Sequence, residues 1–196
     1  MFDRHFAHHT FSSHLTLMSN SDTNRNPRLW RHCHWVSDRP VYPDTLQYPV
    51  GRVLVEVGLQ SKPGDGEPNH WKIVFALAWN LSVAFDLHPP TPLDYVGELF
   101  LVQRPYIRSF SAIVTTNVSL CGHFTVADAL KVIRDKELLW YRLSEERKGG
   151  RAWVEKVIRA LVDAKYATYP DQLSQNLTRV WNAESREEEE PLKELD

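Results

Sequence analysis

The sequence predicts an α+β fold in a single domain, with an antiparallel or mixed sheet of about five strands packed against two or three C-terminal helices. Segments with the two-residue period of strands come first, and segments with helical periodicity follow them. The chain has 196 residues and a hydrophobic content of 42%, which suits one globular core. Because strands and helices do not alternate along the chain, we expect them to form separate layers.

Five segments predict the strands of this sheet. In the first, Val53, Val55 and Val57 fall on one face, with Leu54 and Glu56 between them. The second is a long apolar run suited to a central strand, and Asn80-Leu81 predicts a tight link from it to the third. The run His88-Pro89-Pro90 ends the third strand. The five segments are 52–59, 70–79, 82–87, 98–103 and 107–118.

The predicted helices lie in the last third of the chain. Thr125 is a suitable N-cap with Asp128 three residues later, and an apolar stripe follows at helical spacing. Segment 138–143 either ends this helix or forms a short strand. After Gly149-Gly150, apolar residues recur at helical spacing up to Val162, and a last short helix is expected within 170–181.

The two ends of the chain differ in composition from the middle. Residues 1–28 are polar and turn-rich, with scattered histidines that match no metal-ligand spacing, and we expect a mobile extension. Residues 29–182 then form the domain. Residues 183–196 contain a run of four glutamates and are expected to form a solvated acidic tail.

Bulk properties exclude several classes of protein. The net charge of -2 and the lack of a basic stripe argue against a nucleic-acid partner. Two cysteines, Cys33 and Cys121, are too few for a disulfide framework and predict reduced thiols in a cytoplasmic protein. No apolar run is long enough to span a membrane. The sequence predicts no metal and no cofactor, and it does not indicate an oligomeric state.

Four ordered motifs carry a resemblance to a known family. They are His70-Trp71 at the start of a strand, Ser82-Val83-Ala84-Phe85-Asp86 in the next strand, Thr125 to Leu130 at a helix start, and Gly149-Gly150-Arg151-Ala152-Trp153-Val154 at another. In this order they resemble a family of small fungal proteins of unknown function. That pattern is in turn similar to circularly permuted papain-like enzymes, which pair a histidine on a strand with a cysteine at a helix start.

The resemblance implies a base at His70 and a nucleophile at position 150, where this chain has glycine. Thiol catalysis therefore cannot be carried over to Gly150. The pair Cys121 and His123 is the alternative thiol site, although a buried structural cysteine is the commoner role for such a residue. Asp86 lies inside an apolar strand and needs a partner, either His70, His88 or an arginine. The candidate catalytic residues are His70, Asp86, Cys121 and His123.

The abundance of aromatic residues suggests a pocket for an apolar ligand. The chain has seven Trp, seven Tyr and eight Phe, and packing in the core is the alternative for each of them. The glycines at 149 and 150 would let a ligand approach exposed N–H groups at the helix start. The candidate substrate-binding residues are Trp71, Trp79, Phe85, Trp140, Tyr141, Gly150, Arg151 and Trp153.

Three functions remain open from the sequence. The first is a cofactor-independent enzyme of fungal specialised metabolism, a cyclase, isomerase or pericyclase that folds a hydrophobic terpenoid or polyketide-like substrate. The second is a papain-like thiol hydrolase or acyltransferase that uses Cys121. The third is a non-catalytic module that binds a small molecule or a protein.

Overall fold

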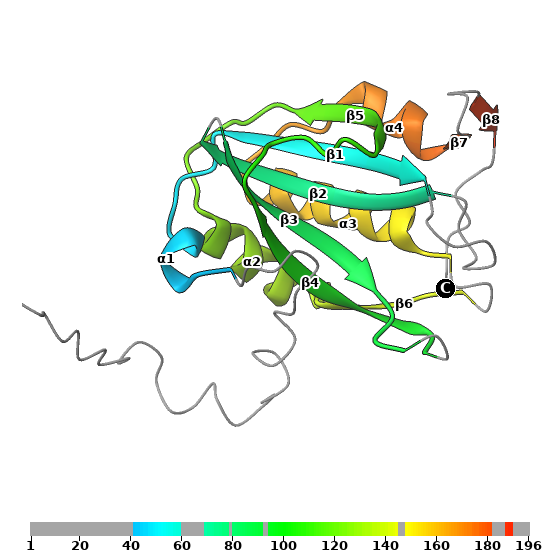
Figure 1. Ribbon diagram of the computed structural model, residues 1–196, viewed down its shortest axis with the longest axis horizontal. Coiled ribbons are helices and arrows are strands. Elements are labelled where there is room, and N and C mark those ends of the chain that lie inside the picture. The colour runs from blue at the N-terminus through cyan, green and yellow to red at the C-terminus, as the bar shows by residue number, and fades with distance from the viewer. Residues whose placement is uncertain are drawn as a thin grey trace, which may run out of the picture. The chain divides into compact units, whose positions relative to one another are not determined.

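The computed structural model describes residues 41–59, 69–78, 80–91, 94–144, 148–181 and 187–189 (Figure 1). All of them belong to one compact unit, Cys33–Asp196. The N-terminal extension, Cys33, the turn at 62–66 and Trp79 lie outside the described residues. The strands are β1 (Arg52–Leu59), β2 (Asn69–Ala78), β3 (Leu81–His88), β4 (Val96–Arg104), β5 (Ala112–Val118), β6 (Trp140–Arg142), β7 (Arg179–Trp181) and β8 (Glu187–Glu189). The helices are α1 (Pro43–Leu46), α2 (Val126–Asp135), α3 (Gly150–Asp163) and α4 (Asp171–Leu177).

The main sheet has six strands in the order β5-β1-β2-β3-β4-β6, and every neighbouring pair is antiparallel. The predicted α+β class is therefore confirmed, with six strands where the sequence predicted about five. The sixth is β6, which resolves segment 138–143 in favour of a strand. The order of the four central strands follows the chain, because each of β1 to β3 pairs with the next strand in sequence, whereas β5 pairs with β1 and β6 pairs with β4.

One strand boundary was wrong. The sequence predicts a strand over 107–118, but β5 begins only at Ala112. Residues 105–111 form an irregular connection, in which the Ser109 N–H donates to the Glu56 carboxylate on β1 at 2.8 Å. A contact between residues 53 positions apart overrides the local strand preference of this segment.

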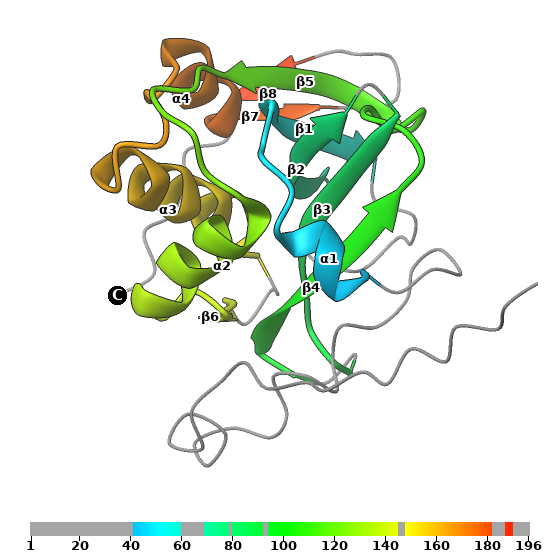
Figure 2. The same ribbon diagram turned by 90° about the vertical axis from the view of Figure 1, so that its left-hand side faces the viewer.

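The hydrophobic core lies between the sheet and the helices. Figure 2 shows α2, α3 and α4 on one side of the sheet. Val53, Val55 and Val57 of β1 point to this side and are fully buried, and the strand register places alternate residues of β2 and β3 beside them. From α3, the apolar stripe that includes Val157 and Leu161 is buried on this side, where α3 packs against β2. We call this side of the sheet the helix face.

Local signals explain where α2 and α3 begin. The Thr125 hydroxyl accepts from the Asp128 N–H at 3.1 Å, and the Asp128 carboxylate accepts from the Thr125 N–H at 2.8 Å. This reciprocal capping box confirms the predicted start of α2. Gly149 precedes α3 where a Cβ atom would come within 2.8 Å of the Leu143 side chain. The glycine therefore allows α3 to start close beside the β6 segment.

The C-terminal elements are tied back to the sheet by side-chain hydrogen bonds. Asn69 at the start of β2 bonds both the carbonyl and the N–H of Trp181 in β7, at 2.6 and 2.7 Å. The backbone of β8 then pairs with β7. Three of the four glutamates in the acidic run, Glu187–Glu189, thus form a strand, which their charge pattern does not indicate. No helix in the described residues is both long enough and apolar enough to span a lipid bilayer.

Candidate functional site

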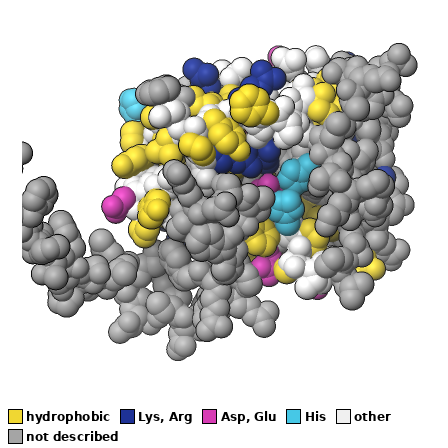
Figure 3. Space-filling model, in the orientation of Figure 1, with side chains coloured by type: hydrophobic (Ala, Val, Ile, Leu, Met, Phe, Trp, Pro, Cys, Tyr) yellow, Lys and Arg dark blue, Asp and Glu magenta, His cyan; other side chains and the backbone are white. Residues whose placement is uncertain are grey.

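The sheet side opposite the helices carries a row of charged groups. Glu56 pairs with Lys72 between β1 and β2, and Lys72 pairs with Asp86 between β2 and β3, so the three side chains lie in one cross-strand row. All three are buried. We call this side the polar face, defined by Glu56, His70, Lys72, Asp86, His88 and Arg104. In Figure 3, histidine side chains reach its surface with acidic and basic side chains beside them.

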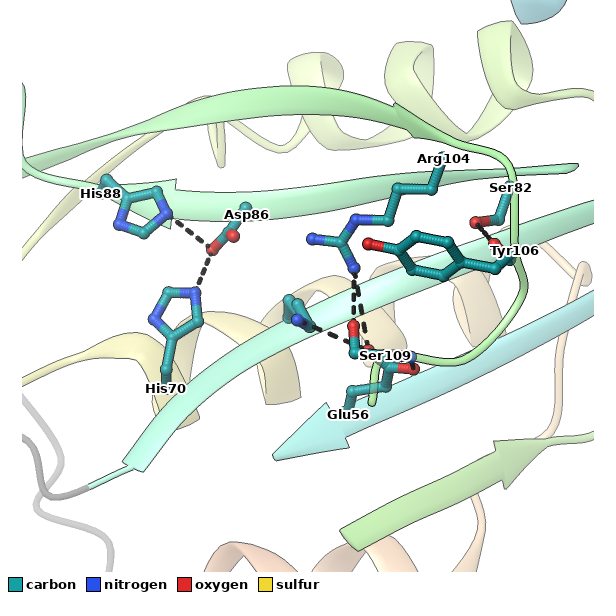
Figure 4. Close-up of polar contacts among 9 residues, drawn as sticks. Glu56, His70, Ser82, Asp86, His88, Arg104, Tyr106 and Ser109 are labelled. Atoms are coloured by element: carbon teal, nitrogen blue, oxygen red, sulfur yellow. Dashed lines mark hydrogen bonds and ion pairs between the residues drawn. The ribbon is translucent and has the colours of Figure 1, made fainter. Parts of the chain in front are cut away.

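Asp86 lies between two histidines on the polar face. His70 is two residues before Lys72 and His88 is two residues after Asp86, so both project to the same side as the charged row. Nε2 of His70 lies 2.7 Å, and Nε2 of His88 lies 3.1 Å, from the same Asp86 oxygen, Oδ1 (Figure 4). The two imidazole rings stack with their centroids 4.7 Å apart. The predicted need of Asp86 for a partner is thus confirmed by two contacts.

Both close contacts converge on one oxygen of Asp86. Oδ1 of Asp86 is buried and has no hydrogen-bond partner among the described residues, although two ring nitrogens lie within ion-pair distance of it. One donor atom from each of His70, Asp86 and His88 lies within 4.8 Å of the other two. Two imidazoles and one carboxylate are a common ligand set for transition metals in proteins. We therefore treat this His–Asp–His cluster as a candidate metal site.

The electrostatics of the cluster follow from burial and proximity. Burial alone would raise the pKa of the Asp86 carboxyl, but the adjacent His70 and His88 outweigh it and hold that pKa well below its usual range. Burial lowers the pKa of His88, but the Asp86 carboxylate beside it dominates and raises that pKa above its ordinary value. The cluster therefore stabilises a negative charge on Asp86 and a positive charge beside it.

A second charged group lies next to the cluster and holds the β4–β5 connection. Glu56 Oε2 lies 3.5 Å from the Lys72 ammonium and 3.8 Å from the Arg104 guanidinium. Arg104 also donates to the Ser109 hydroxyl at 3.0 Å, and its guanidinium lies 5.9 Å from the ring centroid of Tyr106. Figure 4 shows Arg104 and Ser109 converging on Glu56. The connection therefore lies across the middle of the polar face.

A small apolar cluster supports this connection from below. Its members lie in one row across the four central strands, and the partly buried Ile107 of the connection packs against them. The members are Leu54, Val74, Ala84 and Val102. The apolar contact and the Glu56 contacts together leave the end of the face with His70 and His88 less covered. The side chains of these two histidines are 31% and 38% exposed.

Burial changes the chemistry of Lys72. Desolvation and the nearby Arg104 charge lower the pKa of its ammonium, and the attraction of Glu56 and Asp86 offsets only part of this effect. Lys72 is thus a buried cation next to the His–Asp–His cluster. Sequence reasoning missed it because a lysine in an apolar strand carries no local sign of its partners.

The structure separates most of the predicted pocket residues from this site. Trp71, Phe85 and Trp153 are buried on the helix face, and the Trp153 indole donates to the Leu138 carbonyl at 2.8 Å. These side chains contribute to the core. His70 lies on the polar face, so in the described part of the chain the sheet separates it from Trp153, and the two do not border a common pocket.

The remaining predicted ligand-binding residues lie near α3 and β6. The buried Arg151 donates to the Leu177 carbonyl at the end of α4. The ring of Tyr141 is buried with the Lys156 ammonium 5.0 Å from its centroid, whereas Trp140 on β6 is exposed. Gly150 is the first residue of α3 and is partly buried. None of these positions belongs to the polar face.

The second predicted catalytic pair is far from the first. Cys121 and His123 follow β5, whose end pairs with the start of β1, while His70 pairs with Gly58 near the end of β1. Five residues of extended β1 separate the two pairing positions, or about 17 Å. Cys121 is exposed, so it is not the buried thiol that its sequence context favours. Its side chain has no hydrogen bond with His123 in the described part of the chain.

One residue of the cluster escaped prediction as a site residue. His88 was interpreted as part of the strand-ending run with Pro89 and Pro90, and only as one possible partner of Asp86. The available signal was the spacing Asp86-x-His88, because residues two apart in a strand share a face. Placing His70 beside them required the β2–β3 register, which no local pattern specifies.

Fold and site together define a small α+β domain that presents a His–Asp–His cluster on the sheet face opposite its helices. The chain belongs to the family described as "Domain of unknown function (DUF7770)", whose model matches residues 52–194. The predicted membership in a family of unknown function is confirmed at this level. No curated protein and no solved structure matches the chain.

Proposed function

We propose that this protein is a metal-dependent enzyme acting on a small molecule, with a divalent transition metal held by His70, Asp86 and His88. The observation that carries the proposal is the convergence of three donor atoms, from two neighbouring strands, within 4.8 Å of one another. Ligands bound at about 2.1 Å to a tetrahedral centre lie about 3.4 Å apart. The contacts of 2.7 and 3.1 Å between Asp86 and the two histidines are close to that spacing.

The ligand set indicates the kind of metal and its role. Two histidines and a carboxylate favour Fe²⁺ or Zn²⁺ over Mg²⁺ or Ca²⁺, which prefer oxygen ligands. Three protein ligands leave at least one coordination position for water or substrate, which is typical of catalytic sites. The partial exposure of His70 and His88 provides access to such a position. The metal would polarise a bound oxygen or lower the pKa of a bound water.

A metal-free acid–base enzyme is the second candidate. The observation that favours it is the 2.7 Å contact between His70 Nε2 and Asp86, because a carboxylate can orient an imidazole for proton transfer. Under this alternative the site promotes cyclisation or isomerisation of an apolar substrate in fungal specialised metabolism. The fungal origin is supported only by the ordered sequence motifs, and the apolar substrate only by the abundance of aromatic residues.

Metal titration of the purified, chelator-treated protein tests the first candidate. We expect isothermal titration calorimetry with Zn²⁺ to show one site that is weakened at least tenfold in Asp86→Asn and in His88→Ala, since each removes a ligand. His123→Ala, an exposed histidine distant from the cluster, is the matched control and should bind like the wild type. Zn²⁺ affinity unaffected by both cluster variants would contradict the metal proposal and leave the acid–base candidate.

A further inference from the structure

Lys72 is a buried cation whose donors are poorly satisfied. An ammonium group has three N–H donors, but in the described residues Lys72 has one ion-pair contact, at 3.5 Å to Glu56 Oε2. That oxygen is shared with Arg104, and the other Glu56 oxygen accepts from the Ser109 N–H. A buried cation with unused donors is costly unless a further partner completes its shell.

The formal charges of the polar face indicate whether the missing partner of Lys72 is an anion or a cation. The buried carboxylates of Glu56 and Asp86 balance the buried cations of Lys72 and Arg104. A divalent metal at the His–Asp–His cluster adds two positive charges, of which the partly buried Glu98, opposite His88 in the β3–β4 pair, can offset one. Excess positive charge in a partly desolvated site attracts an anion strongly, and the metal's open position can take one of its oxygens.

The position of Lys72 suits a residue that pairs with an anion bound at the metal. Lys72 and Asp86 are directly opposite in the β2–β3 pair, where Cβ atoms lie about 4.5 to 5.5 Å apart. Lys72 therefore lies beside Asp86 in the cross-strand row, and the Asp86 charge acts on its ammonium. On the other side, the ring of Phe100 contacts His88 edge-on, with centroids 5.8 Å apart. Arg104 is held by Ser109 and Glu56 under the β4–β5 connection, which leaves Lys72 as the buried cation of this face directly opposite a proposed ligand.

We infer that the ligand of this site is a small carboxylate-bearing molecule, whose carboxylate binds the metal through one oxygen and forms an ion pair with Lys72. The inference rests on the proposed metal function and adds the substrate class. It assigns Lys72 as a substrate-binding residue, whereas Glu56 and Arg104 position it. The carboxylate thereby offsets the excess charge of the metal centre.

Oxalate titration of the Co²⁺-loaded protein tests this inference. Co²⁺ replaces the native metal because its visible absorption bands report its ligands. We expect oxalate to change these bands saturably in the wild type. In Lys72→Met, Co²⁺ should bind as before, but oxalate should bind about 10- to 100-fold more weakly, the effect of losing one charge-assisted contact. Lys131→Met, which removes an exposed lysine on α2, is the matched control and should behave as the wild type.

Each outcome of this experiment decides the question. Equal oxalate affinity in Lys72→Met and the wild type, with Co²⁺ bound in both, would overturn the inference and leave the metal site standing. Failure of the wild type to bind Co²⁺ at the cluster would overturn both. If Lys72→Met does not fold because Glu56 loses one of its two cationic partners, the double variant Glu56→Gln/Lys72→Met removes both charges, and the same loss of oxalate affinity is expected.

Discussion

At the scale of single residues, the chemistry of this protein is concentrated where charge is buried without full hydrogen bonding. Oδ1 of Asp86 and Oε2 of Glu56 are both buried and without a hydrogen-bond partner in the described residues. Each is instead approached by two cationic or imidazole nitrogens. Such groups reduce stability compared with apolar packing, so their presence on one face indicates a role in binding.

The pKa shifts of the cluster predict how stability depends on pH in the metal-free protein. Because the pKa of Asp86 is lowered on folding, its contribution is present above the unfolded pKa of about 3.9 and is lost as pH falls. Because the pKa of His88 is raised, its contribution is present below the unfolded pKa of about 6.5 and is lost as pH rises through the folded pKa. We expect maximum stability between about pH 4 and 6.5.

Urea unfolding in the presence of EDTA across this pH range measures the effect. The variant His88→Ala should lose the decline on the alkaline side that the His88–Asp86 contact produces, while His123→Ala should retain it. A wild-type stability that increases steadily from pH 5 to 8 would contradict the assignment of the raised pKa to His88.

At the scale of elements, local sequence signals determine some element boundaries and tertiary contacts determine others. The capping box of α2 is local and was visible in the sequence, whereas the late start of β5 depends on Glu56. Capping-box loss therefore has a defined cost. We expect Thr125→Ala to lower the free energy of unfolding by about 1 kcal/mol, because it removes the acceptor for the Asp128 N–H. Thr178→Ala, whose exposed hydroxyl bonds only the Gln175 carbonyl, should change it less, as measured by urea denaturation.

A second prediction at the scale of elements concerns the packing of Gly97 in β4 against β3. A Cβ atom at this position would lie 2.8 Å from Cγ of Leu87, a core residue of β3. We expect Gly97→Ala to destabilise the protein by about 1 to 3 kcal/mol through displacement of Leu87. Gly51→Ala is the control, because its Cβ would meet nothing closer than a carbonyl oxygen at 3.6 Å. Equal melting temperatures for the two variants would contradict the steric explanation.

At the scale of the whole molecule, the hydrophobic core and the candidate site lie on opposite faces of the sheet. The helix face contains the hydrophobic core, and the polar face contains the candidate site. We expect Leu161→Ala, in the fully buried stripe of α3, to cost about 2 to 5 kcal/mol of stability. The folded fraction should nevertheless bind Zn²⁺ with the wild-type affinity.

The opposite pattern is expected for His88→Ala, with weaker Zn²⁺ binding and little loss of core stability. Thermal unfolding and calorimetry on the two variants measure both quantities. Loss of Zn²⁺ affinity in well-folded Leu161→Ala would show that the two faces are coupled.

The same separation explains how much the sequence could predict. Strand periodicity, capping residues and the order of elements were sufficient for the α+β class and for most element boundaries. The need of Asp86 for a partner followed from the cost of burying a carboxylate. The assignment of Trp153 to a pocket with His70 failed because the two lie on opposite sides of the sheet. Lys72, Glu56 and Arg104 come together only through strand register, which depends on the packed core.

The register of β2 against its neighbours has an evolutionary consequence. A shift of one residue would turn Lys72 and His70 into the core and bring Trp71 and Ile73 out to solvent. The apolar residues that fix the register of β2 therefore also keep the candidate metal ligands on one face of the sheet. Loss of a histidine of the cluster would leave the buried valines and the isoleucine of these strands in place, so the geometry would remain in which a single substitution restores the lost ligand.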